Sequence, residues 1–198
     1  MTIVLATGNA HKLFEVNLIL KELLGADVEV KMPRDFGFTE DVEEDGATFA
    51  ENALIKADAI HRALSLPVIA DDSGLCVDAL GGAPGIYSAR YGGEHGNDQK
   101  NNERLLRELD GVTARTARFV SAIAYVSDSH RFTVEGEVKG EILTSPRGEA
   151  GFGYDPLFYY APKQKTLSEL TANEKNEVSH RRAALAALVE RWKEEGIV

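Results

Sequence analysis

The chain contains a single cysteine, Cys76, and no run of apolar residues long enough to span a membrane. One cysteine cannot form a disulfide within the chain and lacks the neighbours of a cysteine metal cluster, so a reducing compartment fits. A membrane-spanning helix needs about 20 consecutive apolar residues, and the opening segment MTIVLATGN is too short and too polar for a signal peptide. We therefore expect a cytoplasmic protein with no membrane partner.

Basic residues are also in deficit. Lysine and arginine together number 22 against 32 aspartates and glutamates, which gives a formal net charge of −10 at pH 7. A general nucleic-acid binder needs a basic face that displaces counterions, so we expect no nucleic-acid partner. A small anionic ligand remains compatible with this charge if lysine, arginine and backbone N–H groups gather locally. The length of 198 residues and the hydrophobic content of 43% predict one globular domain over residues 1–198.

The first half of the chain alternates between short apolar runs and amphipathic segments. Strands are expected at residues 3–6, 28–32 and 67–71. The helix after the first strand is expected to end at Gly25. The pattern Thr48-x-x-Glu51 is a capping box, and it predicts a second helix that runs to about Leu64. This β-α-β-α-β order favours a largely parallel sheet with right-handed crossovers.

The second half changes this pattern. We expect a polar helix at 97–109, strands at 118–126 and 131–138 joined as a hairpin, a glycine-rich loop at 146–156, a short strand at 157–160 and a terminal helix at 173–195. The hairpin gives the sheet an antiparallel part. The sequence therefore predicts an α/β fold with a mixed β-sheet and flanking helices, arranged as two lobes of one sheet.

Two adjacent carboxylates, Asp71 and Asp72, follow the apolar run at 67–70 and precede Ser73-Gly74. Ser-Gly predicts that the strand ends there in a turn, and the carboxyl ends of strands in open α/β sheets are where ligands bind. Because strand side chains alternate, one carboxylate is expected on each side of the sheet. Such a pair could hold a divalent cation or deprotonate a water, or it could simply form an acidic turn.

The segment TGNAHK at residues 7–12 joins the first strand to the first helix. A turn in that place points backbone N–H groups and the positive end of a helix outward, which suits a phosphate. Lys12 adds a charge, and Gly8 allows close approach. The alternative is that Asn9 merely caps the helix and that Lys12 is solvated.

Three further segments carry candidate groups. Glu43 and Glu44 precede the second helix, and Lys56 lies two turns into it, on the edge of its apolar stripe. One of the two carboxylates could complete a Mg²⁺ site with Asp72; a solvated charge run is the alternative. The loop GFGYDP at 151–156 offers a flat aromatic face and exposed backbone, as needed to stack a base and read its edge. Within the terminal helix, residues 175–182 supply lysine, histidine and arginine donors for a base carbonyl and phosphates, or only a basic surface.

Taken together, these segments resemble the inosine/xanthosine triphosphate pyrophosphatases, the Ham1-like pyrophosphatases of non-canonical purine nucleotides. The matching segments are LATGNAHKLFEV, VEEDGATFAENALIKA, IADDSGLCVDALGGAPGIYSARYGGE, RGEAGFGYDPLF and LTANEKNEVSHRRAAL. They occur in the family's order and extend from residue 5 to about 185. Five such segments across the chain are far more specific than any one of them.

The resemblance implies a cytoplasmic homodimer with an elongated α/β fold and a nucleotide cleft between two lobes. It implies Mg²⁺-dependent hydrolysis of ITP, dITP and XTP to the monophosphate and pyrophosphate, which cleanses the nucleotide pool. It implies catalytic roles for Asp72 as proton acceptor and for Lys12 and Lys56, with Glu44 and Asp72 as metal ligands. The substrate-binding residues that it implies are Thr7, Gly8, Asn9, Ala10, His11, Lys12, Ser73, Phe152, Gly153, Tyr154, Asp155, Lys175, His180 and Arg181.

Selectivity is expected at O6 of the purine. Hypoxanthine and xanthine accept a hydrogen bond there, whereas adenine presents an amino group, and a buried donor left unpaired costs about 1–3 kcal/mol. Two alternatives remain open at this point. One is a pyrophosphatase of other nucleotides, such as a Maf-like enzyme acting on pyrimidines; the other is a nucleotide-sensing or nucleic-acid-binding protein that performs no chemistry.

Overall fold

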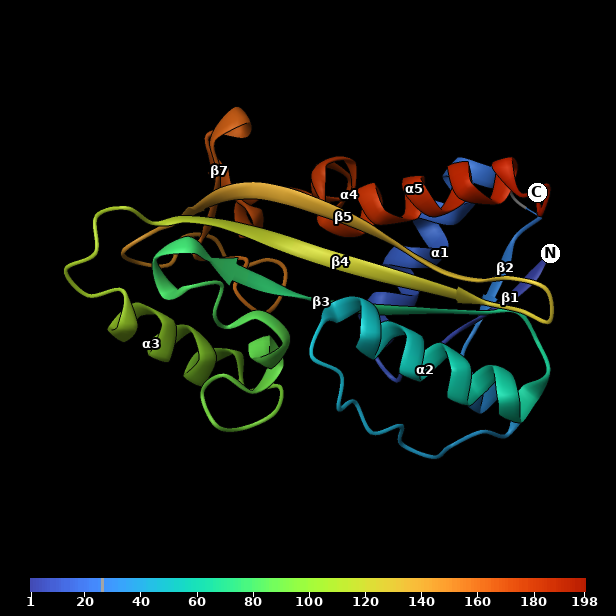
Figure 1. The fold of residues 1–198 in the computed structure, drawn as a ribbon. Coiled ribbons are helices and arrows are strands. Elements are labelled where there is room, and N and C mark those ends of the chain that lie inside the picture. Colours follow the sequence, from blue (N-terminus) through green and yellow to red (C-terminus); the bar gives the residue numbers. More distant parts are fainter. Residues whose placement is uncertain (26) are drawn as a thin grey trace. The chain divides into compact units, whose positions relative to one another are not determined.

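A seven-stranded mixed sheet runs through the computed structural model, which describes residues 1–25 and 27–198 (Figure 1). Its strand order is β2-β1-β3-β4-β5-β6-β7. The strands are β1 (Thr2–Leu5), β2 (Glu29–Lys31), β3 (Val68–Val77), β4 (Thr116–Val126), β5 (Arg131–Ile142), β6 (Phe158–Tyr160) and β7 (Lys165–Thr166). Strand β1 pairs in parallel with β2 and β3, whereas β6 pairs antiparallel with β5 and β7. The predicted α/β class with a mixed sheet is confirmed.

Five α-helices flank these strands in the described residues. They are α1 (Ala10–Leu24), α2 (Phe49–Leu64), α3 (Asp98–Glu108), α4 (Ala172–Val178) and α5 (His180–Glu194). The predicted caps are present: the side chain of Thr48 accepts from the Glu51 N–H, and the Gly25 N–H closes α1 on the Lys21 carbonyl. None of the helices in the described part of the chain combines the length and the apolar character needed to cross a bilayer.

The chain divides into two compact units, and β3, β4 and β5 each contribute residues to both. The first unit comprises Met1–Asp72, Ser121–Gly136 and His180–Val198. In this unit, α1 and α5 pack on one face of the strands and α2 packs on the other (Figure 1). Ile3, Leu5 and Ile69 face α1 and α5, whereas Val4 and Val68 face α2. The alternation expected of strand side chains therefore sets which helix each strand residue meets.

The second unit comprises Ser73–Val120 and Glu137–Ser179. Its core gathers apolar residues of β3, β4, β5, β6 and α3 around the glycine-rich loop. Leu105 of α3 and Leu109, which caps the end of that helix, belong to this core, and Phe119 packs on Phe158 with ring centroids 4.7 Å apart. Whether residues 1–198 act as a single domain, and where a nucleotide cleft lies, stay predictions.

Two local predictions were wrong. The segment Asp71-Asp72-Ser73-Gly74 forms no turn, because β3 continues without interruption from Val68 to Val77. Turn-favouring residues are accommodated in the strand because the two carboxylates find side-chain partners on either face. The single terminal helix is two helices, because Ser179 is extended (φ −71°, ψ 151°) between α4 and α5. Lys175 therefore lies in α4 and Arg181 in α5.

Candidate active site

Strand β3 presents its two aspartates to opposite helices. Asp71 has the same orientation as Ile69, toward α1 and α5, and Asp72 has that of Val68, toward α2. The predicted division of the pair between the two sides of the sheet is therefore confirmed. Asp71 is only 3% exposed, and Asp72 is half-buried.

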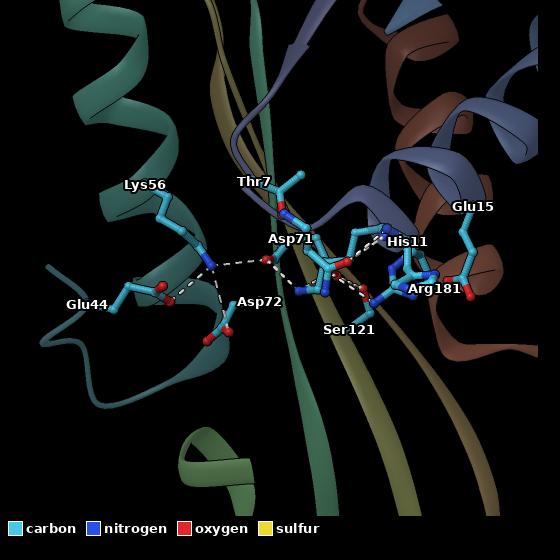
Figure 2. Close-up of polar contacts among 11 residues, drawn as sticks. Thr7, His11, Glu15, Glu44, Lys56, Asp71, Asp72, Ser121 and Arg181 are labelled. Atoms are coloured by element: carbon cyan, nitrogen blue, oxygen red, sulfur yellow. Dashed lines mark hydrogen bonds and ion pairs between the residues drawn. The ribbon is translucent and has the colours of Figure 1, made fainter. Parts of the chain in front are cut away.

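Asp71 is the centre of a buried ionic cluster (Figure 2). Its carboxylate accepts from Lys12 Nζ at 2.7 Å, from Arg181 Nη2 at 3.2 Å and from Ser121 Oγ at 2.6 Å. Burial by itself raises the pKa of the Asp71 carboxyl, but Arg181 and Lys12 oppose it and hold that pKa well below its usual range. Asp71 is therefore ionised at neutral pH and serves as the counterion of two cations.

Arg181 lies in the first turn of α5 and is almost completely buried. Its guanidinium also donates to Glu15 of α1, so it joins α5 to both α1 and β3 within the first unit. Although burial lowers the pKa of Arg181, Asp71 and Glu15 raise it beyond its ordinary value. A guanidinium carries several N–H donors in a fixed plane, so it can make both ion pairs at once and is held in one orientation by them. His180, which precedes it, is also buried.

Lys56 of α2 lies near two further carboxylates, those of Glu44 and Asp72, as Figure 2 shows. Its Nζ is 3.0 Å from Glu44 Oε2 and 3.9 Å from Asp72 Oδ1. Burial raises the pKa of Asp72, Lys56 lowers it, and Glu44 raises it again, with a net increase. A carboxylate whose pKa is raised can take up a proton more readily than an ordinary aspartate, which suits a general base.

Both lysines also contact the main chain of one residue. Lys56 Nζ donates to the Asp71 carbonyl oxygen at 3.1 Å, and Lys12 Nζ lies 3.4 Å from the same atom. Burial lowers the pKa of Lys12, and Asp71 partly restores it. The two ammonium groups thus converge on Asp71 from opposite faces of β3.

The turn before α1 is exposed and internally bonded. Asn9 is the N-cap, and its Oδ1 accepts from the N–H groups of His11 at 2.9 Å and Lys12 at 3.3 Å; Thr7 Oγ1 accepts from the Asn9 N–H at 3.0 Å. Asn9 therefore caps the helix, and these three N–H groups are already engaged. Lys12 is not solvated as that alternative supposed, because its ammonium pairs with the buried Asp71. A Cβ built on Gly8 meets no atom within 4 Å, so glycine is not required there by the fold. The space in front of it is open to a ligand.

A second group of predicted residues lies in the second unit. Lys175 of α4 pairs with Asp155 at 2.7 Å, and both side chains are buried. The Lys175 ammonium lies 4.5 Å from the centroid of the Phe152 ring, which is 37% exposed. The Phe152 N–H donates to Asp155 Oδ2 at 3.0 Å. A buried ion pair therefore supports an exposed aromatic ring.

Glycine is needed in this loop at residue 151, where φ is +81° and a Cβ would lie 2.2 Å from Asp155 Oδ2. Tyr154 turns inward: its hydroxyl donates to the Ser88 carbonyl at 2.8 Å, and burial raises its pKa. Ser73 is a half-buried residue of β3. Tyr154 thus anchors the loop, whereas Phe152 is the residue that the loop exposes.

The structure accordingly sorts the predicted residues into two groups. The first unit holds Thr7, Gly8, Asn9, Ala10, His11, Lys12, Glu44, Lys56, Asp72, His180 and Arg181. The second holds Ser73, Phe152, Gly153, Tyr154, Asp155 and Lys175. Their roles in catalysis and binding stay predictions.

The carboxylates of the first unit suit a hard divalent cation. Glu44 and Asp72 both reach Lys56, so their oxygens share one neighbourhood. Lys12, Lys56 and Arg181 face four carboxylates, those of Glu15, Glu44, Asp71 and Asp72, which leaves a charge of −1 when all are ionised. The described residues hold no cluster of three or more metal-ligating side chains. Two carboxylates are enough for Mg²⁺, which fills its other positions with waters and phosphate oxygens.

Three residues that support these groups were not predicted. Ser121 of β4 and Glu15 of α1 bond Asp71 and Arg181, and Asn52 of α2 accepts from the Gly46 N–H at 2.8 Å and hydrogen-bonds Asp72. Asn52 is 4% exposed. A polar residue one turn before Lys56 on the inner face of α2 was a usable signal. Ser121, inside an apolar strand far along the chain, gave none.

This chain matches a family model and resembles relatives that share one name. A model of the Ham1 family matches residues 3–191. The chain is 52% identical over 195 residues to a protein of Geobacillus kaustophilus named dITP/XTP pyrophosphatase, covering 97% of this chain and 94% of that protein. It is 52% identical over 188 residues to the Bacillus subtilis protein of the same name, covering 93% of each.

Solved structures agree with this result. The Ham1 protein of Staphylococcus aureus superimposes with a TM-score of 0.89 at 42% identity, covering 98% of this chain and 100% of that one. A nucleoside-triphosphatase / dITP/XTP pyrophosphatase of Mycobacterium abscessus superimposes with a TM-score of 0.78 at 45% identity, covering 95% of this chain and 98% of that one.

Proposed function

The chain belongs to the Ham1 family, and from that premise we propose that it hydrolyses deaminated purine nucleoside triphosphates, dITP, ITP and XTP, to the monophosphate and pyrophosphate. The relatives' names supply the substrate class. The observation in the chain itself that carries the proposal is the convergence of Lys12 and Lys56 on Asp71 of β3, with the carboxylates of Asp72 and Glu44 beside Lys56. Two cations and two carboxylates in that arrangement can bind a triphosphate and activate a water.

Each group has a proposed role. Asp72, whose pKa is raised by burial, accepts the proton of the water that attacks the α-phosphorus. Lys12 and Lys56 stabilise negative charge on the departing pyrophosphate, and their contacts with Asp71 hold both ammonium groups in place for it. The open space in front of Gly8 lets phosphate oxygens approach the main chain of the turn at residues 7–12.

Glu44 and Asp72 are proposed to hold Mg²⁺. When bound, the ion neutralises charge on the phosphates and the leaving group. The net charge of −1 on the ionised cluster supports this requirement, because a triphosphate adds further negative charge that the three cations alone do not balance.

The second unit is proposed to contact the base. Phe152 offers a stacking face beside the Lys175 ammonium, and Lys175 is the proposed donor toward O6 from this unit. His180 and Arg181, which belong to the first unit, are also proposed as substrate contacts. The Phe152 N–H is already bonded to Asp155, so that donor is not available to read the base edge. Hypoxanthine and xanthine would satisfy a donor at O6 that adenine leaves unpaired.

We further propose that the enzyme is a cytoplasmic homodimer that binds neither nucleic acid nor membranes. The single cysteine is compatible with a reducing compartment, and the net charge of −10 disfavours polyanionic partners.

A panel of eight nucleoside triphosphates, assayed with and without Mg²⁺, tests the proposal. We expect monophosphate and pyrophosphate from ITP, dITP and XTP, and at least about a hundredfold lower kcat/KM for ATP, since several contacts of about 1–3 kcal/mol must combine. GTP shares O6 with these substrates, so its rejection must depend on its 2-amino group. Preference for pyrimidine nucleotides would favour a Maf-like enzyme instead. Binding of ITP without product formation would identify a nucleotide sensor.

A further inference from the structure

We propose that Asp98 and Asn102 of α3 are positioning residues for base recognition, because they clamp the backbone of Gly153 and so fix the Phe152 ring. The inference rests on the proposed function, in which Phe152 stacks on the base. Neither residue belongs to the set that the family resemblance implies.

The clamp has two hydrogen bonds of opposite polarity. The Gly153 N–H donates to Asp98 Oδ2 at 2.6 Å, and Asn102 Nδ2 donates to the Gly153 carbonyl oxygen at 3.0 Å. Asp98 and Asn102 are four residues apart on α3, so they lie on one face of the helix, one turn apart. Two side chains one turn apart can therefore reach both the N–H and the carbonyl oxygen of Gly153. Held at both groups, the Gly153 backbone has little freedom to rotate.

The backbone of the preceding residue, Phe152, is held as well. The Phe152 N–H donates to Asp155 Oδ2 at 3.0 Å, and the Phe152 carbonyl accepts from the Asp155 N–H at 3.3 Å. All four backbone polar groups of Phe152 and Gly153 are therefore bonded to the protein. Asp98 and Asn102 supply the half of this bonding that comes from outside the loop.

What the clamp presents is an exposed aromatic ring. Phe152 is 37% exposed, although the Asp155 and Lys175 side chains beneath it are buried. A loop stabilised only for its own sake would turn its ring inward, as it does with Tyr154, which is 4% exposed. Fixing a solvent-facing ring lowers the entropy lost when a flat ligand stacks on it.

Asn102 also has an unfavourable feature, a buried oxygen, that its contact with the loop explains. Its Nδ2 bonds Gly153, but its Oδ1 is buried and has no hydrogen-bond partner in the described part of the chain. An apolar side chain there would avoid an unpaired buried acceptor. The amide is therefore unfavourable for the helix alone and useful for holding the loop.

The test uses the full-length protein with Asn102→Leu, Asp98→Ala and Asp98→Asn. Gln99→Ala is the matched control, because Gln99 lies on the same helix and bonds Glu103 instead of the loop. Binding of IMP, which has the base, and of inorganic triphosphate, which lacks it, is measured by calorimetry. The kcat and KM for ITP are measured from monophosphate formation.

We expect Asn102→Leu and Asp98→Ala each to raise the Kd for IMP about threefold to tenfold, the effect of one lost hydrogen bond. The KM for ITP should rise more than kcat falls, and the Kd for triphosphate should not change. Asp98→Asn should behave almost as wild type, because its amide oxygen can still accept from the Gly153 N–H. Gln99→Ala should match wild type in every measurement.

The proposal is overturned if Asn102→Leu, folded by circular dichroism, binds IMP within about twofold of wild type, or if IMP and triphosphate binding weaken alike. Asn102→Leu decides the matter even if Asp98→Ala fails to fold, since leucine is a good helix former. Failure of the proposed function is a separate result: the wild type would bind IMP but form no monophosphate from ITP, dITP or XTP. A wild type that does not bind IMP refutes both.

Discussion

Replacing Asp71 with asparagine removes the buried counterion of Lys12 and Arg181 while keeping the shape of the side chain. The substituted amide could still accept from one cation and donate to Ser121, so the hydrogen-bond count changes little and the loss is mainly of charge. Breaking a buried ion pair by removing one partner costs about 3–5 kcal/mol. Arg181 keeps its pair with Glu15, and the Lys12 side chain is 19% exposed. We therefore expect Asp71→Asn to lower the free energy of unfolding by about 2–4 kcal/mol at pH 7.

The pH dependence of that difference follows from the depressed pKa of Asp71. A carboxyl whose pKa is lower in the folded state stabilises the fold above its unfolded pKa of about 3.9, and this stability is lost as the pH falls through its folded pKa. The difference in the free energy of unfolding between wild type and Asp71→Asn should therefore be constant from pH 7.5 to 5.5. It should narrow by about 0.7 kcal/mol at pH 3.5.

Urea denaturation followed by circular dichroism at these pH values measures both effects. Asp58→Asn is the matched control, because Asp58 pairs with Arg131 at 2.8 Å where the two side chains are 26% and 58% exposed. An exposed pair contributes about 0–1 kcal/mol, so this control should change little. Two results would refute the role of Asp71 in the buried ionic cluster. One is a decrease in the free energy of unfolding below about 1 kcal/mol for Asp71→Asn; the other is a difference from wild type that does not become smaller at acid pH.

Three other predictions concern the first unit. Gly136→Ala should lower the free energy of unfolding by about 3 kcal/mol or more in urea denaturation, because its Cβ would lie 2.1 Å from the Ala184 nitrogen of α5; a change within about 0.5 kcal/mol, the range of ordinary surface substitutions, would contradict this. Glu44→Gln should raise the Mg²⁺ concentration for half-maximal pyrophosphate release about tenfold or more, whereas Glu43→Gln should not. Arg181→Ala should reduce the kcat/KM ratios of ITP and XTP over ATP and GTP, and unchanged ratios would assign base recognition elsewhere.

Much of the fold was accessible from local signals. The Thr48 cap and the Gly25 stop bracket α2 and α1 where the sequence placed them, since capping depends on a few neighbouring residues. The run at 67–71 predicted the start of β3 but not its length. Ser73 and Gly74 favour a turn, yet both lie within β3, whose neighbours in the sheet, β1 and β4, are remote in the sequence.

The break between α4 and α5 was not predicted, because the local pattern there favours a continuous helix. Helical periodicity continues across residues 173–195, and neither proline nor glycine interrupts it. Ser179, a residue favoured at helix N-caps, was the one local sign. The break separates Lys175, which pairs with Asp155, from Arg181, which pairs with Asp71 and Glu15.

The candidate site shows the same limit. Lys12, Lys56 and Asp72 could be chosen because their residue types suit the chemistry. Their supporting residues could not, because Ser121 lies 50 residues from Asp71 and Glu15 lies 166 residues from Arg181. Contacts between such distant positions are fixed by tertiary packing and have no local pattern.

The central claim is that Asp72 performs the chemistry while its neighbour Asp71 supports the structure. The direct measurement is pyrophosphate release from ITP by Asp72→Asn, with urea denaturation of the same preparation. Because burial raises the pKa of Asp72, its charge is disfavoured in the folded state, so the neutral amide should not lower the free energy of unfolding. We expect a fully stable protein that binds IMP and releases almost no pyrophosphate. Near-normal turnover by the folded variant would contradict the claim.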